Sequence, residues 1–465
     1  MQNPRRVFNA PTVGIGCVLL GAIALRAPLL AGGQIDYDEG VYWQSLRSLA
    51  AGHPLFASVF SSQPPAFLLL LMPPYRLMGD TIVAARVAVL VVALLGIAAA
   101  GRAAWLLAGP GAGVLAAALM AADPLLFRQS VTLQSDGPAV ALGLVAIAMA
   151  AQARASSERR AVLLAAGAGA VLAIAILTKL LAVAAFPAVL VLLVGRPVNP
   201  RMVPRLFGAA TLGWGVAMAA LLLPFISVWS DLWAETVSFH LHARSAPLGG
   251  LDAQTYLREL PIALLGVVGF LIALRRAPML AATVAVWAIT AALGLIVQHP
   301  VWPHHAVALV APLTVASGAI TLPLTARPIG SAVTAAGAAA VVLAGSITSA
   351  AYVRALQEPA AAVEPTIAAL RASTRPADLV ISDDQFATAL AGRSTPPELV
   401  DTSLVRVTAG DLTVDEVIAV AQRWHVRAVL LRTERLSAVP SLRAWLDQHF
   451  PDSISLGTGR TLYVR

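Results

Sequence analysis

Residues 11–42 read PTVGIGCVLLGAIALRAPLLAGGQIDYDEGVY, an apolar run that ends in a cluster of carboxyls. About 20 apolar residues are enough for a helix to cross the roughly 30 Å hydrocarbon core of a bilayer. Asp36, Asp38 and Glu39 follow this run, in a chain that holds only 24 Asp and Glu among 465 residues. The stretch therefore predicts a membrane helix with a chemically active acidic segment at its far end.

Many similar apolar runs follow, so the whole chain is predicted to be a polytopic helical membrane protein. It is 58% hydrophobic and 12% charged, with a mean hydropathy of +0.79, which excludes a soluble enzyme. The single cysteine, Cys17, excludes an internal disulfide and a cysteine-cluster metal site. The net charge of +8 is the arginine excess expected of cytoplasmic loops, and it implies no nucleic-acid partner.

The connections between the predicted spans give an orientation. Alternate connections collect the arginines, for example Arg5, Arg102 and Arg159, and these connections are predicted to be cytoplasmic. The N-terminus is then cytoplasmic, the protein lies in the plasma membrane among its lipids, and the acidic segment faces outward. We predict eleven spans, at residues 12–30, 82–107, 110–126, 135–152, 161–178, 180–194, 206–228, 260–274, 278–297, 303–322 and 329–351.

Two domains are predicted. Residues 1–354 form the membrane domain, whose first outer loop, 31–80, holds an interfacial helix over 39–51 and a second short helix over 66–77. Residues 355–465 form an outer soluble domain of α/β type, because short buried strands alternate with amphipathic helices. This tail lacks the common nucleotide-binding and hydrolase motifs, so we predict an accessory role for it, either in packing over the active face or in touching the acceptor. Its predicted strands are 378–382, 426–431 and 461–464, and its helices are 413–424 and 440–450.

The acidic segment has two interpretations. Asp38 can cap the helix that follows it, with Glu39 in the first turn, where the helix dipole favours carboxylates. A carboxylate here can also act as a general base toward an acceptor hydroxyl. Three carboxyls exceed the needs of one cap and lie where lipid-linked substrates arrive, which favours the chemical interpretation.

Two cations are candidates for binding a phosphate. Lys179, the only lysine in the chain, lies at the outer boundary, where it either snorkels to the interface or provides a point charge for a phosphate. Arg86 lies about one turn inside the second span and is predicted to point into a polar cavity. There it either binds ligand or pairs with Asp36 or Asp136.

Further polar residues face outward between later spans. Asp136 either starts the next span or takes part in function. The histidines and Arg244 form an interfacial polar rim, or the adjacent pair His304 and His305 forms a divalent metal site with a carboxylate; no other cofactor is indicated. The histidines in question are His240, His242, His299, His304 and His305.

As a set, these residues resemble the GT-C glycosyltransferases, in the branch of the dolichyl-phosphate-mannose protein mannosyltransferases and the aminoarabinose-to-lipid A transferases. The likeness covers roughly residues 10–200 with ordered spacing. One departure is Gln63, where the family usually has a lysine before the Pro-Pro pair. The matching motifs are Asp38-Glu39 with Tyr42, Gly52-His53-Pro54, Pro64-Pro65, Ala84-Ala85-Arg86, Asp136 and Lys179.

The resemblance implies an enzyme that takes a sugar from a polyprenyl-phosphate donor. A hydroxyl on a lipid, glycan or protein acceptor attacks the anomeric carbon with inversion, and Asp38 acts as the base. The resemblance implies catalytic roles for Asp38, Glu39 and Asp136, and donor-phosphate binding by Lys179, Arg86 or Arg244. The remaining site candidates are Asp36, Tyr42, His53, Gln63, His304 and His305.

Two other classes compete with this prediction. A transporter or lipid flippase should place ionisable residues near the middle of its spans or break helices at matched positions in two halves. The charged residues of this chain instead cluster toward one face. A non-catalytic subunit that kept the family fold would tolerate loss of Asp38.

Overall fold

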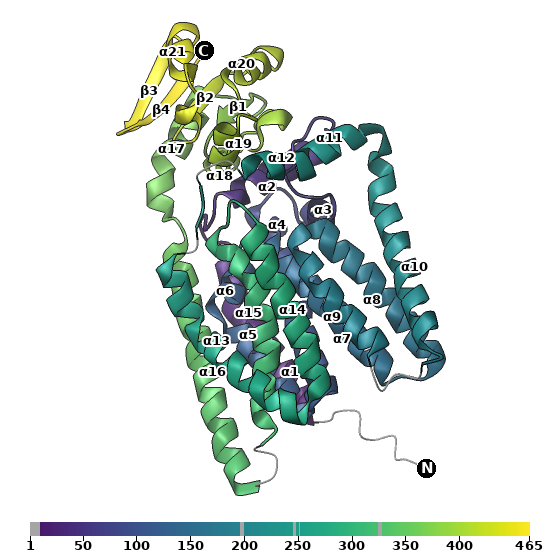
Figure 1. Cartoon of the computed structure of the whole chain (residues 1–465). Helices are drawn as coiled ribbons and strands as arrows, with labels where there is room; N and C mark the ends of the chain where they lie inside the picture. Colours follow the sequence, from purple (N-terminus) through teal and green to yellow (C-terminus); the bar gives the residue numbers. More distant parts are fainter. Residues whose placement is uncertain (1–9, 196–199, 245–247, 251, 324–327) are drawn as a thin grey trace.

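The computed structural model describes residues 10–195, 200–244, 248–250, 252–323 and 328–465. Most of this part of the chain is helical, and a small sheet lies at one end of the helical bundle (Figure 1). The predicted fold class, a polytopic helical protein with a small C-terminal α/β region, is confirmed. The 354/355 domain boundary stays a prediction.

Nine helical segments among the described residues are long and apolar enough to cross a membrane. They confirm a multi-pass membrane protein. The helices that provide these segments are α1 (Ala10–Arg26), α4 (Ile82–Ala108), α7 (Asp136–Arg154), α8 (Glu158–Thr178), α10 (Val203–Leu222), α13 (Ala253–Arg276), α14 (Pro278–Val297), α15 (Val307–Ser317) and α16 (Pro328–Leu356).

Two of the eleven predicted spans form helices that are shorter than a span. α5 (Pro110–Ala122) has 13 residues, about 20 Å at 1.5 Å per residue, against the roughly 30 Å of the hydrocarbon core. It ends because Asp123 caps a new helix, α6 (Pro124–Gln129), by accepting a hydrogen bond from the Leu126 amide. The segment 180–194 is divided between a 3-10 turn, η2 (Leu180–Ala185), and α9 (Phe186–Val194).

Small residues let the membrane helices approach closely. A Cβ at Gly169 in α8 would lie 1.9 Å from the carbonyl oxygen of Ala210, and one at Gly213 in α10 would lie 2.0 Å from that of Ala166. The two backbones therefore touch along this crossing, as small residues allow in membrane helix pairs. In the core of the bundle, alanine, valine and leucine dominate.

Residues 31–80, the predicted first outer loop, fold as predicted into two helices, α2 (Asp38–Ala50) and α3 (Ala66–Met78). In Figure 1 these helices and two further short ones, α11 (Trp229–Trp233) and α12 (Phe239–Ala243), lie at the end of the bundle that carries the sheet. Short 3-10 and π turns complete the membrane part: η1 (Ala27–Leu29), η3 (Leu223–Val228), η4 (Ala234–Ser238), η5 (Pro303–Ala306) and η6 (Gly318–Thr321).

The C-terminal sheet has the strand order β1-β2-β4-β3, with β1 and β2 parallel and the other pairs antiparallel. The three predicted strands are confirmed as β1 (Val380–Ser382), β2 (Ala428–Leu431) and β4 (Arg460–Val464). Strand β3 (Asp452–Gly457) was not predicted, although Ile454 and Leu456 alternate with serines, because this alternation is short and its residues are largely exposed. The helices of this region are α17 (Ala360–Ser373), α18 (Gln385–Leu390), α19 (Leu404–Ala409), α20 (Val414–Arg423) and α21 (Leu442–His449), with 3-10 turns η8 (Pro397–Leu399) and η9 (Leu436–Ala438).

The C-terminal region docks on α2 through buried polar bonds. Gln44 Nε2 donates to the carbonyls of Gln385 and Arg393 at 3.3 and 3.0 Å. The Trp43 and Phe386 rings meet edge to face with centroids 5.4 Å apart. Trp43 and Gln44 lie on α2, the helix that starts at Asp38. The docked C-terminal region therefore lies beside the acidic segment.

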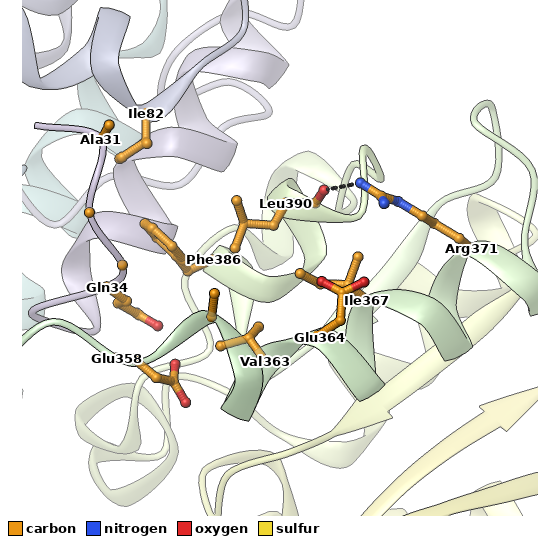
Figure 2. A pocket seen from close by; sticks show the side chains of 13 residues that line it. Ala31, Gln34, Ile82, Glu358, Val363, Glu364, Ile367, Arg371, Phe386 and Leu390 are labelled. Atoms are coloured by element: carbon orange, nitrogen blue, oxygen red, sulfur yellow. Dashed lines mark hydrogen bonds between the residues drawn. The ribbon is translucent and has the colours of Figure 1, made fainter.

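A cavity of about 330 Å³ remains between the two regions near the start of α4. Figure 2 shows Ala31 and Ile82 on one side and Val363 of α17 on the other, with Phe386 and Leu390 between them. These lining groups are mainly apolar, while Glu358, Glu364 and Arg371 supply charge. The cavity is therefore a mixed apolar and charged space at the junction.

The predicted orientation can be tested with reporter fusions. Alkaline phosphatase, which is active only outside the cytoplasm, should be active when fused after Leu356 and inactive when fused after Arg276. A fluorescent-protein fusion at each site should give the opposite pattern and serves as the control. Active phosphatase after Arg276 would reverse the orientation and move the acidic segment to the cytoplasmic side.

Candidate active site

A buried ion pair between Glu39 and Arg86 lies at the centre of the site. Both side chains are fully buried, and the Arg86 Nη2 and Nε atoms each lie 2.8 Å from a Glu39 carboxylate oxygen. The same carboxylate accepts hydrogen bonds from the backbone amides of Ile35 and Leu133 at 2.7 and 2.8 Å. These bonds use the acceptor positions of Glu39 and join the first loop, α2, α4 and the segment before α7.

Arg86 uses its remaining donors on the same loop. Its Nη1 donates to the carbonyls of Leu30 and Gly32, and its Nη2 donates to that of Gly33. Of the two roles predicted for Arg86, the structure contains the ion pair, but with Glu39 rather than with Asp36 or Asp136. Since its donors are occupied, we do not assign it to a donor phosphate, and we treat Glu39 as a positioning residue rather than a reacting one.

Asp38 is next to the Glu39–Arg86 ion pair in the chain, but its electrostatic environment is different. Burial and the neighbouring carboxyl of Asp36 raise the pKa of Asp38 to about 8, while the positive charge of Lys179 opposes the rise. Asp36 itself accepts a hydrogen bond from the Asp38 amide at 3.3 Å and pairs with Arg128 at 2.7 Å. Asp38 is therefore a carboxyl whose affinity for a proton suits exchange near neutral pH.

A second charged group lies across the site at the start of α7. Lys179 Nζ is 2.8 Å from Asp136 Oδ2, so the two residues, 43 positions apart, form an ion pair. His304 Nε2 and His305 Nε2 each lie 3.9 Å from a carboxylate oxygen of Asp136. Asp136 Oδ1 has no hydrogen-bond partner among the described residues.

Asp136, His304 and His305 form a group that could hold a divalent ion, since their ligand atoms lie within 4.8 Å of one another. Two contacts oppose such an ion in this arrangement. Lys179 already supplies a cation to Asp136. The Trp302 amide donates to His305 Nδ1 at 3.2 Å, which in a neutral ring leaves the proton on Nε2, the atom that faces Asp136. We therefore route no step through a metal.

The other sequence candidates lie in different surroundings. Tyr42 is buried, with its ring edge-on to Phe67, and Gln63 is buried beside Ser61, whose hydroxyl donates to the Gln63 carbonyl. His53 packs against the Trp424 ring of the C-terminal region. Arg244 is exposed and donates to the Val297 carbonyl, and among the described residues no hydrogen bond or ion pair joins it to Asp38.

Sequence reasoning missed Arg128 and Asp401. Arg128 lies on the predicted outer side, where basic residues are uncommon. This unusual position could have identified Arg128 as a site candidate from the sequence. Asp401 comes from the C-terminal region and raises the pKa of Asp38 by its negative charge. Its neighbour Thr402 donates its amide to the Tyr37 hydroxyl at 3.0 Å. No local pattern marks Asp401, because it reaches the site only through domain docking.

Comparison with known proteins supports the family resemblance. The family model for dolichyl-phosphate-mannose-protein mannosyltransferases matches residues 62–230. Two structures of ArnT from Cupriavidus metallidurans are similar to this chain, and each match covers 98% of this chain and 98% of ArnT. The apo structure shares 16% sequence identity with this chain at a TM-score of 0.69. The structure bound to undecaprenyl phosphate shares 17% at a TM-score of 0.68. The archaeal oligosaccharyltransferase AglB from Archaeoglobus fulgidus, in complex with an inhibitory peptide and a dolichol-phosphate, shares 13% identity with a TM-score of 0.57, covering 90% of this chain and 69% of AglB.

At these identities the structural likeness shows the fold, which is of the GT-C type. Together with the family match, it supports the GT-C superfamily and the branch recognised from the sequence. A search of curated protein sequences finds no match.

The Glu39–Arg86 pair gives a stability prediction. Glu39→Gln should leave the fully buried Arg86 without a counter-charge, which typically costs about 3–5 kcal/mol. Thermal unfolding of the purified protein in detergent should therefore occur at a clearly lower temperature than for the parent. Adding Arg86→Met should recover part of the loss, because it removes the unpaired charge. Glu364→Gln, at an exposed position, is the control, and equal unfolding temperatures for Glu39→Gln and this control would refute the role.

Proposed function

We propose that the protein is an integral-membrane glycosyltransferase that moves a sugar from a polyprenyl phosphate to a hydroxyl acceptor at the outer face of the plasma membrane. The observation that carries the proposal is the position of Asp38. It is a half-buried carboxyl with a pKa raised to about 8, within electrostatic reach of Lys179. A base and a cation at one site are what transfer from a phosphate to a hydroxyl requires.

In the proposed reaction Asp38 takes the proton of the acceptor hydroxyl. The acceptor oxygen forms a bond to the anomeric carbon as the bond from that carbon to the donor phosphate oxygen breaks. The electron pair of the broken bond leaves with the phosphate, and attack from the opposite side inverts the anomeric centre. Asp38 must be ionised to act, so its raised pKa makes it a stronger base once it has lost its proton.

Lys179 is the proposed ligand of the leaving phosphate. An ammonium has three donors, and Asp136 engages one of them, so the others stay available within the described surroundings. Asp136 holds the cation in place, and the neighbouring His304 and His305 can donate from their rings. Positive charge fixed where negative charge develops stabilises the transition state and is a major source of catalysis.

The match at residues 62–230 and the GT-C fold support this chemistry over transport. A transporter should carry its ionisable groups near the middle of its spans. In this chain Asp136 starts α7, Lys179 caps the end of α8, and Arg86 is in the first turns of α4. Undecaprenyl phosphate bound to ArnT supports a polyprenyl-phosphate donor here.

Loss of the base should abolish transfer. Asp38→Asn should lower turnover by roughly 10²- to 10⁴-fold, since it removes general-base catalysis, and should leave the unfolding temperature unchanged. The assay is release of polyprenyl phosphate from sugar-loaded donor in proteoliposomes. Asp231→Asn, an exposed outer carboxyl, is the control. Near-parental turnover in Asp38→Asn would defeat the assignment and would fit a non-catalytic subunit.

The same carboxyl predicts the pH profile of the parent enzyme. Because the pKa of Asp38 is raised to about 8 and the ionised form is active, kcat/KM should rise about tenfold per pH unit below that value and level off above it. A profile that is flat between pH 6 and 8 would exclude Asp38 as the titrating base.

Removal of the Lys179 charge should affect the donor selectively. Lys179→Met should lower kcat/KM for the donor tenfold or more, about 1.4 kcal/mol, with little change in the acceptor KM. Lys179→Arg should recover part of the loss, because a guanidinium keeps the charge with a different shape. If Lys179→Met handles donor like the parent, the lysine is an interfacial anchor and Arg244 becomes the next candidate.

A further inference from the structure

A second cavity, of about 230 Å³, lies between the first outer loop and the C-terminal sheet. Asp36 and Tyr37 form its membrane-side wall, immediately before Asp38. It shares Gln34 and Glu358 with the more apolar cavity of Figure 2. A molecule held there would therefore lie beside the proposed base, on the side away from the membrane bundle.

The opposite wall is the carboxyl edge of the parallel strands. Asp383 and Asp384 directly follow β1, and Arg432 and Thr433 directly follow β2. In α/β sheets, ligands bind preferentially at the carboxyl ends of parallel strands. The part of the chain without a recognisable motif thus turns its usual ligand-binding edge toward the acidic segment.

The loops at this edge are held rigidly. Asp383 Oδ1 accepts hydrogen bonds from the Arg432 and Thr433 amides at 2.7 and 3.0 Å. Arg432 pairs with Asp384 and, at 2.6 Å, with Glu358. These contacts fix the two loops relative to each other and to the chain leaving α16.

Two buried polar atoms at this edge are still unsatisfied. Within the part of the chain that the structure describes, Asp383 Oδ2 and Arg432 Nε have no hydrogen-bond partner. Asp383 is fully buried, and this burial raises its pKa to about 6. A buried polar group without a partner is energetically unfavourable. A hydroxyl matches both kinds of group, because it can donate to a carboxylate oxygen and accept from a guanidinium N–H.

The charges of the cavity disfavour an anionic ligand. Its lining mixes the carboxyls of Asp36, Glu358, Asp383 and Asp384 with the guanidiniums of Arg432 and Arg435. The carboxylates accept hydrogen bonds from hydroxyls and the guanidiniums donate to them, whereas an anion would meet the excess of negative charge. The volume is below the roughly 300–1,000 Å³ of sites for drug-sized ligands, which suits one sugar unit.

We propose that this cavity, which we call the strand-edge subsite, binds one neutral sugar unit of the acceptor, so that the acceptor is a glycan or a glycolipid. The assignment of this sugar to the acceptor rests on the proposed transferase function. Binding of a neutral sugar at Asp383 does not depend on it. The C-terminal region then takes part in substrate recognition, which is the acceptor-touching form of the accessory role predicted from its sequence.

Asp383→Asn is the most selective test of the subsite. Asparagine keeps an Oδ1 that can accept the Arg432 and Thr433 amides, and it replaces the unpartnered Oδ2 with a donor. Saturation-transfer NMR on the full chain in nanodiscs, with the methyl glycosides of glucose, mannose, galactose and arabinose, should detect binding of at least one glycoside to the parent. Its Kd should rise tenfold or more in Asp383→Asn.

One control variant and one further subsite variant accompany Asp383→Asn. Arg443→Ala lies on the exposed side of α21 and should bind like the parent. Arg435→Gln removes a donor from the rim without entering the sheet core, and should also weaken binding, so the test holds even if Asp383→Asn unfolds. Binding of no glycoside by the parent, unchanged binding in both subsite variants, or tighter binding of glucose 6-phosphate than of any neutral glycoside would each overturn the proposal.

Asp38→Asn separates this inference from the proposed function. It should bind the glycoside like the parent while transferring no sugar. If the parent transfers sugar but binds no glycoside at the subsite, the subsite is wrong and the transferase stands. If glycoside binding depends on Asp383 while the parent never releases polyprenyl phosphate, the subsite stands and the transferase proposal fails.

Discussion

The buried ion pair between Glu39 and Arg86 is the constraint on which the rest of the site depends. A charge at the edge of a membrane bundle is costly to bury unless it is paired and hydrogen-bonded. Here the carboxylate is bound by the guanidinium and by two backbone amides, and the guanidinium in turn binds three loop carbonyls. This network fixes the first residues of α2 against α4, and so fixes the backbone of the adjacent Asp38.

The adjacent carboxyls of Asp38 and Glu39 therefore lie in different electrostatic environments. Glu39 has its negative charge compensated by Arg86, whereas Asp38 is half-buried beside Asp36 with a pKa of about 8. Across the site Asp136 shares its charge with Lys179. Placing titratable groups in unequal environments is how one site can hold both a proton acceptor and fixed charges. The Glu39 carboxylate holds the loop against α4. Asp38 therefore has no part in this structural contact.

Docking of the C-terminal region extends this arrangement beyond the membrane. The contacts of Gln44 with Gln385 and Arg393 hold α18 on α2. The same docking brings Asp401 near Asp38 and sets the carboxyl edge of β1 and β2 over Asp36. The sheet thus forms one wall of a cavity whose other wall is the acidic segment. A region of the chain that looks accessory by motif is a structural part of the site.

The sequence by itself determined the helical membrane fold, most span positions, the two loop helices, three of the four strands, and the group of candidates around Asp38. These features follow from local periodicity and hydropathy, which each segment carries regardless of its partners. Only the tertiary structure decided that Arg86 pairs with Glu39, that His304 and His305 meet Asp136, and that Arg128 and Asp401 join the site. These contacts link residues far apart in the chain. From the sequence alone, many of the polar residues predicted to face outward were equally good candidates for each contact. Their selection rests on packing distances, and the pKa of Asp38 follows from the burial and charges that packing creates.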